Sequence, residues 1–468
     1  MELPVLIAEL QERLAGDGER YKILTTTVHE LVQNGRLRPG ERLPAERELA
    51  REVGVSRTTV VRAYAALEAL GSLERRVGSG SYVTRRDESD APRMADLMTG
   101  PIEVVPPRAR GLINLSISTP PIPLELPAAI HSVVAEVFAR ARFATQHIEG
   151  DPELRQWVAD WYTGRGLDTD PGQILITAGA QQALAMSTKV VRPSVSSFVV
   201  EAPTYLGFLD LARMRSSRVL SVPALFDEEH IRQAHAVLAA EDSPLLYAMT
   251  ACHTVTGHAM PEHDKELLAS LLHRTGGMVI DDDTLADELL DGPPGAPLAA
   301  FLDERQIITI GSTSKSLWDG LRVGWIRAPK HLARDLARMK SAYDLGTPVL
   351  SQLVALELLR GSVATAEKRR RDSRRGLTTA TAFIADRMPN WRWFTPAGGR
   401  SLWVQLPPGS DGSRLAADAL AHGVAIASGE TFTNNDTHRD HIRVGFVQPP
   451  GELREGLSRL ATAWAARR

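Results

Sequence analysis

Hydrophobic side chains near the start of the chain recur with the period of an α-helix. Between residues 19 and 35 the apolar positions lie three or four residues apart, and Gly35 ends the pattern, which predicts a helix. A second helix is predicted from about residue 45 to residue 53. A third begins after Ser56, whose hydroxyl can cap it, and Gly54 supplies the turn between the two.

Two short strand-like runs follow these helices. Residues 73–76 and 81–84 flank Val77-Gly-Ser-Gly80, which predicts a small hairpin. The order of three helices and a two-stranded wing places residues 1–86 in one unit. The next stretch, residues 87–111, mixes charges with prolines and has no clear period, so we predict a linker there.

From residue 112 onward, short apolar runs alternate with helical ones. The runs QILITAG, SFVVEAP, LLYAMT, GMVIDDD and QIITIGS are nearly continuous in hydrophobic residues, as the strands of a parallel sheet buried on both faces are. From about residue 345 the chain is rich in helix and then contains strand-like runs near WRWFTP, RSLWVQL and HIRVGFV. The pattern predicts an α/β domain over residues 112–468 with a second α+β lobe. Its functional site is expected at the carboxyl ends of the strands.

Composition limits the class of protein. A chain of 468 residues is too long for one ordinary domain, and 43% hydrophobic with 24% charged residues is a globular balance. The single cysteine, Cys252, excludes an internal disulfide framework and favours a reducing compartment. The N-terminus lacks the basic start of a secretory signal, and no apolar run reaches the length of about 18 residues that spans a membrane. We therefore expect a cytoplasmic protein with no membrane partner and no metal site.

The N-terminal unit is basic although the whole chain is not. Residues 36–86 contain eleven arginines and six glutamates, whereas the formal net charge of the chain is −3. Arginines and threonines open two of the predicted helices, where free N–H groups favour contacts with phosphates and bases, and glycines permit a tight wing tip. The residues that we predict to contact DNA are Arg47, Arg57, Thr58, Thr59 and Gly78. The alternative is a small helical module for protein contacts with ordinary surface arginines.

Residues 20–84 closely resemble the winged helix-turn-helix of GntR-type bacterial regulators. The resemblance is carried by GRLRPGERLPAERELA, GVSRTTVVRAYAALEALG and VGSGSYV. It implies a double-stranded DNA operator as the partner, and it points to the same DNA-contacting residues.

The segment GSTSKSLWDGLRVG, residues 311–324, has side chains that an aldehyde cofactor requires. Lys315 can form a Schiff base, and the hydroxyl of Ser312 can reach phosphate oxygens. Arg322 offers a bidentate fork to the same phosphate. Each residue type alone is common at a protein surface, so the prediction depends on the whole set.

Three other segments supply the remaining partners, each at the expected exit of a strand. In TAGAQQAL the amides of Ala180 and Gln181 open a helix and can bind phosphate. Asp282, at the end of MVIDDD, can keep a pyridine nitrogen protonated. Tyr205, in EAPTYLGF, is placed to stack on the ring.

Residues 112–468 resemble fold-type I aminotransferases, and the whole chain resembles the MocR subfamily of GntR-type regulators. The resemblance implies an aminotransferase-like domain that binds pyridoxal 5′-phosphate, and members of the subfamily are usually homodimers in which each DNA-binding unit packs across the partner. The residues that it assigns to the cofactor are Lys315, Asp282, Tyr205, Ala180, Gln181, Ser312 and Arg322.

Two arginines are candidates for the effector. Arg443, in HIRVGF, matches the arginine with which aminotransferases bind the substrate α-carboxylate, and the alternative is a surface residue on an edge strand. Arg400 begins a strand after AGG and could read a second anionic group. The basic run at residues 368–375 lies in a long helical stretch, where a solvated face is favoured over nucleic-acid binding.

The chain departs from the aminotransferase pattern around the cofactor's phenolic oxygen. Thr254 stands where the family has the asparagine of Asn-Pro-x-Gly, whose amide hydrogen-bonds that oxygen. His253 or Thr254 is the candidate to supply this hydrogen bond instead. Thr284 stands where the family commonly has tyrosine. Residues 145–148 replace the usual entrance segment. These changes alter the chemistry on which catalysis depends, whereas a binding sensor tolerates them.

We therefore predict a pyridoxal phosphate-binding transcriptional regulator that senses a small amine, an amino acid or the cofactor itself. Lys315 is expected to act as an anchor more than as an efficient catalyst. Two alternatives remain: an active aminotransferase with an appended DNA-binding domain, and a cofactor-free regulator that retains only the fold.

Overall fold

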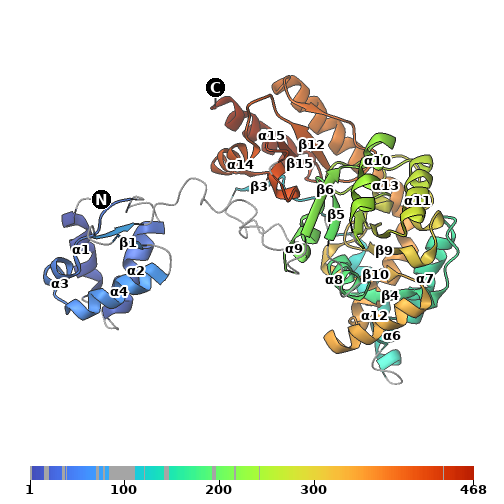
Figure 1. Cartoon of the computed structure of the whole chain (residues 1–468), viewed down its shortest axis with the longest axis horizontal. Helices are drawn as coiled ribbons and strands as arrows, with labels where there is room; N and C mark the ends of the chain where they lie inside the picture. The colour runs from blue at the N-terminus through green and yellow to red at the C-terminus, as the bar shows by residue number, and fades with distance from the viewer. Residues whose placement is uncertain are drawn as a thin grey trace. The chain divides into compact units, whose positions relative to one another are not determined.

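The computed structural model forms two compact units, Met1–Arg93 and Met94–Arg468 (Figure 1). Each unit is described by itself. The structure describes residues 3–14, 20–33, 37, 40–69, 73–76, 80–83, 111–120, 122–141, 147–191, 197–214, 218–241, 243–435 and 437–467. The expected linker, residues 87–111, lies outside these ranges except for Gly111, so its boundaries remain a prediction.

The N-terminal unit has the predicted order of helices and wing. Its elements are α1 (Leu3–Leu14), α2 (Arg20–Gln33), α3 (Glu46–Glu52), α4 (Arg57–Ala69), β1 (Leu73–Arg76) and β2 (Gly80–Val83). The strands β1 and β2 pair antiparallel, with Leu73 opposite Val83. Helix α1 was not predicted. Its Leu6 and Leu10 are buried in the same core as Leu24 of α2, so α1 is part of this unit.

A seven-stranded sheet forms the centre of the C-terminal unit. Its strand order is β4-β10-β9-β8-β7-β5-β6. The strands are β4 (Ile174–Thr177), β5 (Ser197–Ala202), β6 (Arg218–Pro223), β7 (Leu245–Ala248), β8 (Met278–Asp282), β9 (Ile307–Ser312) and β10 (Gly324–Arg327). The five predicted strands, β4, β5, β7, β8 and β9, all run in the same direction, and the strand β10, which was not predicted, pairs antiparallel with both β4 and β9. Only a short loop joins β9 to β10, and it contains no crossover helix of the kind that a parallel connection requires.

Helices cover both faces of this sheet. Helices α8 (Ala180–Val190), α9 (Leu206–Met214) and α12 (Lys330–Tyr343) pack on one face. The other face is covered by α6 (Leu126–Ala141), α7 (Pro152–Thr163), α10 (Glu228–Ala240), α11 (Glu262–Thr275) and the first part of α13 (Val349–Arg387). Successive strand residues enter opposite cores: Val279 packs under α11, whereas Ile280 packs under α8.

The predicted second lobe is present and has its own core (Figure 1). It contains an antiparallel sheet of β11 (Arg392–Trp393), β12 (Ser401–Gln405), β15 (His441–Gly445) and β14 (Ala427–Ser428). Helices α14 (Gly412–Ala421) and α15 (Pro450–Ala465) pack against it. The short strand β3 (Ile113–Asn114) joins this lobe by pairing in parallel with β13 (Val424–Ala425).

Among the described residues, no single helix is long and apolar enough to cross a membrane. Two segments of α13, Val349–Ser362 and Thr365–Arg387, meet that criterion together by length and composition. Residues 353–356, 358 and 359 of the first segment belong to the buried core of the unit.

Candidate cofactor site and DNA interface

The predicted cofactor residues gather at one edge of the central sheet because of its topology. Strands β4, β8 and β9 run in the same direction, and they end next to Gly179, at Asp282 and at Ser312. Lys315 follows three residues after β9. Strand β10 runs the opposite way, so its first residue lies at this same edge, and Arg322 precedes it. Chain segments far apart in sequence therefore converge, as expected for α/β sheets.

The start of α8 and Arg322 form a cradle suited to a phosphate. Gly179 precedes the helix with φ of 86°, and no side chain caps the first-turn amides, which include those of Ala180 and Gln181. Arg322 donates to the Ala178 carbonyl oxygen at 3.1 Å. A Cβ on Gly179 would lie 2.5 Å from the Arg322 guanidinium, so only glycine lets the cation approach this helix end so closely.

Two hydroxyls stand beside this cradle. Ser312 is buried; its Oγ donates to the Val323 carbonyl oxygen at 3.1 Å and lies 2.9 Å from the hydroxyl of Ser314. These contacts fix the turn after β9. To donate to a phosphate, the Ser312 hydroxyl would have to give up its hydrogen bond to the Val323 carbonyl oxygen.

Asp282 is a buried carboxylate held by three donors. The Tyr247 hydroxyl donates to Oδ2 at 2.8 Å, and both the amide and the hydroxyl of Thr284 donate to Oδ1. Burial raises the pKa of Asp282, while the bonds from Thr284 and Tyr247 oppose that rise. Tyr247 and Asp282 come together because both side chains leave their strands on the face that α8 covers.

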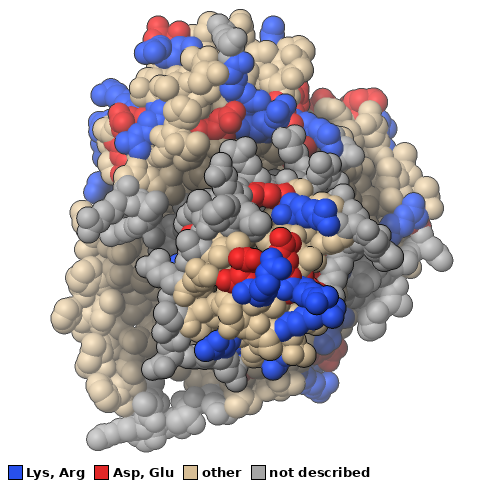
Figure 2. Space-filling view, turned by 90° about the vertical axis from the view of Figure 1, so that its left-hand side faces the viewer, with Lys and Arg blue, Asp and Glu red and all other residues tan. Residues whose placement is uncertain are grey.

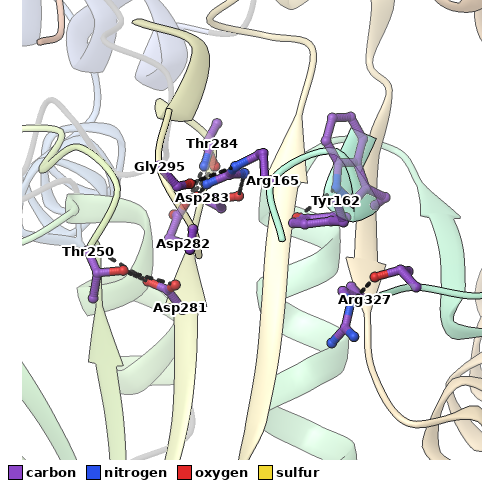
Figure 3. Close-up of polar contacts among 12 residues, drawn as sticks. Tyr162, Arg165, Thr250, Asp281, Asp282, Asp283, Thr284, Gly295 and Arg327 are labelled. Atoms are coloured by element: carbon purple, nitrogen blue, oxygen red, sulfur yellow. Dashed lines mark hydrogen bonds and ion pairs between the residues drawn. The ribbon is translucent and has the colours of Figure 1, made fainter. Parts of the chain in front are cut away.

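The two neighbouring aspartates have other partners (Figure 3). Thr250 donates to Asp281 through its amide at 3.1 Å and through its hydroxyl. Burial and the nearby Asp283 raise the pKa of Asp281 to about 7. Asp283 forms an ion pair with Arg165, which also donates to the Gly295 carbonyl oxygen at 3.1 Å. Of the three successive acids, only Asp282 therefore faces Tyr247, on the side of the sheet that α8 covers.

Tyr205 lies beside the start of α8. Gln181 donates through Nε2 to the Gly207 carbonyl oxygen at 2.8 Å, and a Cβ on Gly207 would lie 2.6 Å from the Tyr205 ring. The buried Oε1 of Gln181 has no hydrogen-bond partner. A half-buried aromatic ring, an unsatisfied polar atom and the cradle thus adjoin one another, which fits a flat ring that carries a phosphate.

Lys315 and Arg443 each donate a hydrogen bond to the same short segment of chain. Lys315 Nζ donates to the Ser118 hydroxyl at 3.3 Å, and Arg443 Nη2 donates to the Ser116 carbonyl oxygen at 2.7 Å. Arg443 is 5% exposed and lies 4.5 Å from the ring centre of Phe432, which contradicts the alternative of a surface residue.

Arg400 stands elsewhere in the same lobe. It is 7% exposed, and its Nη2 lies 2.7 Å from the carboxylate of Glu288 in the short helix η2 (Ala286–Glu288). Its use as a reader of an effector's second anionic group stays a prediction. Within the basic run, Arg370 and Arg374 pair with Glu367, as expected for an ordinary helix face.

Of the two candidate substitutes for the family's asparagine, His253 is already engaged, and Thr254 stays a prediction. Thr254 is half-buried, but His253 accepts from the amides of Val255 and Thr256 and contacts the Pro203 carbonyl oxygen. Burial lowers the pKa of His253 to about 3, so it is neutral. Thr284 is already engaged with Asp282. The first part of the replaced entrance segment, residues 145–146, lies outside the described residues.

The predicted DNA-contacting residues that are described lie at the starts of α3 and α4. Arg47, Arg57 and Thr58 are exposed and Thr59 is half-exposed, whereas Gly78 lies outside the described residues. Ser56 accepts from the amide of Thr59 at 3.1 Å, which is the predicted helix cap. Figure 2 looks onto this unit and shows arginine and lysine atoms beside acidic ones. Arg57 Nη2 lies 3.8 Å from the carboxylate of Glu46.

Several site residues were not found from the sequence. They include the partners of the three aspartates, which are Tyr247, Thr250 and Arg165. They also include Ser118 and Ser116, which accept hydrogen bonds from Lys315 and Arg443. Tyr247 lies in an apolar strand, where it has the pattern of an ordinary core residue. Asp283, the partner of Arg165, lies 118 positions away in the sequence. No local pattern reports such pairings.

The comparisons with known proteins define the class. Residues 110–460 match the aminotransferase class I and II family, and residues 21–83 match the GntR family of bacterial regulatory proteins. The chain belongs to the aminotransferase class I and II family and carries a GntR DNA-binding domain. This is the architecture of MocR regulators, which makes the chain a pyridoxal phosphate-binding transcriptional regulator.

Individual relatives cover either the whole chain or its larger unit. The chain is 27% identical to the HTH-type transcriptional regulator YjiR of Escherichia coli, over 95% of this chain and 98% of that one. It is 32% identical to 2-aminoadipate transaminase of Thermus thermophilus, over 67% and 80%. The structure of the α-aminoadipate aminotransferase LysN from Thermus thermophilus, complexed with N-(5′-phosphopyridoxyl)-L-leucine, matches with a TM-score of 0.70 and 28% identity. That match covers 76% of this chain and 93% of LysN.

Proposed function

We propose that this regulator senses a small molecule that carries both an amine and a carboxylate. The observation that carries the proposal is the convergence of Lys315 and Arg443 on Ser118 and Ser116, two residues of one segment. A lysine that bears an aldehyde cofactor selects amines, and a buried arginine selects carboxylates. An amino acid satisfies both.

The residues present fit pyridoxal phosphate. Arg322 and the first amides of α8 would hold its phosphate, and Tyr205 would face its ring. Asp282 would accept a hydrogen bond from the pyridine nitrogen, and Lys315 would hold the aldehyde carbon. When bound, the cofactor supplies an electrophilic carbon to which amines add. The chain's part is to orient the ring and keep a negative charge at Asp282.

Binding of two probes to the cofactor-free full chain tests this proposal. Pyridoxal phosphate should produce a visible absorbance band in the wild type and none in Lys315→Ala. N-(5′-phosphopyridoxyl)-L-leucine should bind Arg443→Gln roughly tenfold to a hundredfold more weakly than wild type, because a charge-assisted hydrogen bond is lost. Arg392→Gln, an exposed arginine of the same lobe, is the matched control. Equal affinity in Arg443→Gln would exclude a carboxylate-reading role.

We also propose a homodimer in which each GntR domain contacts one half of a repeated operator. Helix α6 presents Ile130, Val134 and Phe138 at a spacing of four residues, with 40%, 44% and 71% of each side chain exposed. Leu124, just before the helix, is 83% exposed. An apolar stripe of this kind suits burial against a second copy.

A charge placed on this stripe should separate the subunits. Val134→Asp with Phe138→Asp should sediment as a monomer where the wild type sediments as a dimer. Ser132→Asp adds a charge to the opposite side of the same helix and serves as the control. A double variant that remains dimeric would place the interface elsewhere. The repeated operator is read from the protection pattern on DNA that precedes the gene.

Transaminase activity is the second candidate function. It is favoured by the 32% identity to 2-aminoadipate transaminase and by the presence of Lys315, Asp282 and Arg443. We expect at most a slow half-reaction, because Thr254 and Thr284 stand at positions that are predicted to affect the phenolic oxygen. Rapid conversion of the cofactor with 2-aminoadipate, at about 1 per second or faster, would favour the enzyme over the sensor.

A further inference from the structure

Residues 115–118, which we call the strap, touch one cation from each lobe of the C-terminal unit. The carbonyl oxygen of Ser116 contacts Arg443 of the small lobe, and the hydroxyl of Ser118 contacts Lys315 of the large lobe. Both serines are buried, with 2% and 6% of the residue surface exposed. Buried hydrogen-bonding groups are costly to leave unpaired, so these contacts constrain where the strap lies.

The start of the strap is fixed to the small lobe. The Leu115 amide donates to Ala425 at 2.8 Å, and the Leu115 carbonyl accepts from Gly445 at 2.6 Å. A Cβ on Gly445 would lie 2.3 Å from the Ile117 carbonyl oxygen, so the strap lies directly against β15. The bond to Ser118 is a link from this anchored segment to Lys315.

The side chain of Ser116 is used differently from its main chain. Its hydroxyl donates to Asn114 Oδ1 at 2.7 Å and its amide donates to the same atom at 2.9 Å. This local turn orients the Ser116 carbonyl oxygen toward Arg443. The Asn114 side chain, two residues before the contact, thus adds to the main-chain bonds that hold the strap.

Cofactor and effector would each compete with one strap contact. A covalent bond at Lys315 Nζ, formed with an aldehyde cofactor and loss of water, removes hydrogens that Nζ can donate to Ser118. An effector carboxylate would form a bidentate pair with Arg443, which adds a second hydrogen bond and an opposite charge that the single bond to the Ser116 carbonyl oxygen lacks. An effector amine that takes over the cofactor's aldehyde carbon would free Lys315 Nζ again, so the Ser118 contact responds to the cofactor and the Ser116 contact responds to the effector.

We propose that Ser118 and the main chain of Ser116 position Lys315 and Arg443 in the cofactor-free protein, that a covalent bond between Lys315 and the cofactor releases the Ser118 contact, and that an effector carboxylate releases the Ser116 contact. This inference rests on the proposed function of the site. The strap follows the residues that connect the two family matches, which end at 83 and begin at 110. The strap is therefore close in sequence to the segment that leads to the DNA-binding unit.

Amide hydrogen exchange of the full chain tests the positioning role. In cofactor-free protein, Ser118→Ala should raise exchange across residues 113–120 roughly twofold to tenfold, the factor expected for one lost hydrogen bond. Ser118→Thr keeps the hydroxyl and should behave as the wild type. Ser341→Ala, which removes an exposed hydroxyl on α12, is the control. Exchange in Ser118→Ala equal to that of the wild type would overturn the proposal.

Two probes then test the exchange of contacts. Pyridoxal phosphate should raise exchange of the same residues in the wild type and add little in Ser118→Ala. N-(5′-phosphopyridoxyl)-L-leucine, which occupies Arg443 through its carboxylate, should raise exchange in both. If the visible band forms and exchange does not change with either probe, the strap is not part of the response. If neither probe binds, the proposed function fails, and the cofactor-free variants still decide the positioning role.

Discussion

Replacement of Arg165 should destabilise the C-terminal unit by a large amount for a single residue. The Arg165 and Asp283 side chains are 5% and 0% exposed, and they form an ion pair at the end of β8. In Arg165→Met, Asp283 keeps its buried carboxylate and loses its counter-charge. The variant also loses the bond to Gly295 and the stacking of the guanidinium on Trp161, whose ring centre lies 4.4 Å away.

The size of the effect follows from that burial. Removal of one partner from a buried pair costs about 3–5 kcal/mol, whereas an exposed pair contributes little. Arg305 and Asp303 form such an exposed pair, with 76% and 33% of their side chains accessible. Arg305→Met is therefore the matched control, and we expect its unfolding midpoint to match that of the wild type.

Urea unfolding followed by tryptophan fluorescence measures this difference in the correct unit. All 8 tryptophans lie in the C-terminal unit, from Trp157 onward, so the signal does not report on the DNA-binding unit. With an m-value of about 4 kcal/mol per M, the midpoint for Arg165→Met should fall by about 1 M. A second variant, Arg165→Met with Asp283→Leu, removes both charges and should recover much of the loss. A midpoint for Arg165→Met equal to that of Arg305→Met would refute the reasoning.

Three further predictions concern pH, DNA and the first helix. The pKa of Asp281 is about 7 in the folded protein and 3.8 in the unfolded chain. As pH rises, Asp281 therefore loses its proton first in the unfolded chain, and the free energy of unfolding falls between about pH 4 and 7. Asp281→Asn should flatten that fall in urea unfolding by up to about 1 kcal/mol per pH unit, and an unchanged slope would contradict it. Arg57→Ala should weaken operator binding by about 1–3 kcal/mol, measured by fluorescence anisotropy, and unchanged affinity would remove α4 from the docking surface. Leu10 is fully buried, so Leu10→Ala should destabilise the N-terminal unit by about 2–5 kcal/mol. Circular dichroism detects the unfolding of this unit, which tryptophan fluorescence does not report. If the unfolding midpoint of this unit in Leu10→Ala equals that of the wild type, α1 is dispensable for its stability.

Strand and helix periodicity predicted most of the fold. The five apolar runs became β4, β5, β7, β8 and β9, because strands buried on both faces must be apolar throughout. Strand β10 was not anticipated: its direction depends on the loop from residue 313 to 323, which has no crossover helix. Helix α1 was also missed, since its reason for folding is the core that Leu6 and Leu10 share with α2.

The candidate site could be predicted only as far as single residues reveal chemistry. Lys315, Asp282 and Arg322 stand in motifs where residue type and position at a strand end agree. Their neighbours do not. Tyr247 has the pattern of a core residue, and the role of the Ser116 carbonyl belongs to the main chain, which sequence does not distinguish.

The register of β8 decides which of three successive aspartates faces the proposed cofactor site. Val279 and Ile280 fill opposite cores, and this fixes Asp281 opposite Ala248 and Asp282 opposite Ile310. A slip of one residue would turn every side chain of the strand to the other face. Asp282 would then leave the face that it shares with Tyr247, and a neighbouring aspartate would take its place beside that tyrosine. Two aliphatic side chains buried in the core thus select the carboxylate that faces the proposed cofactor site.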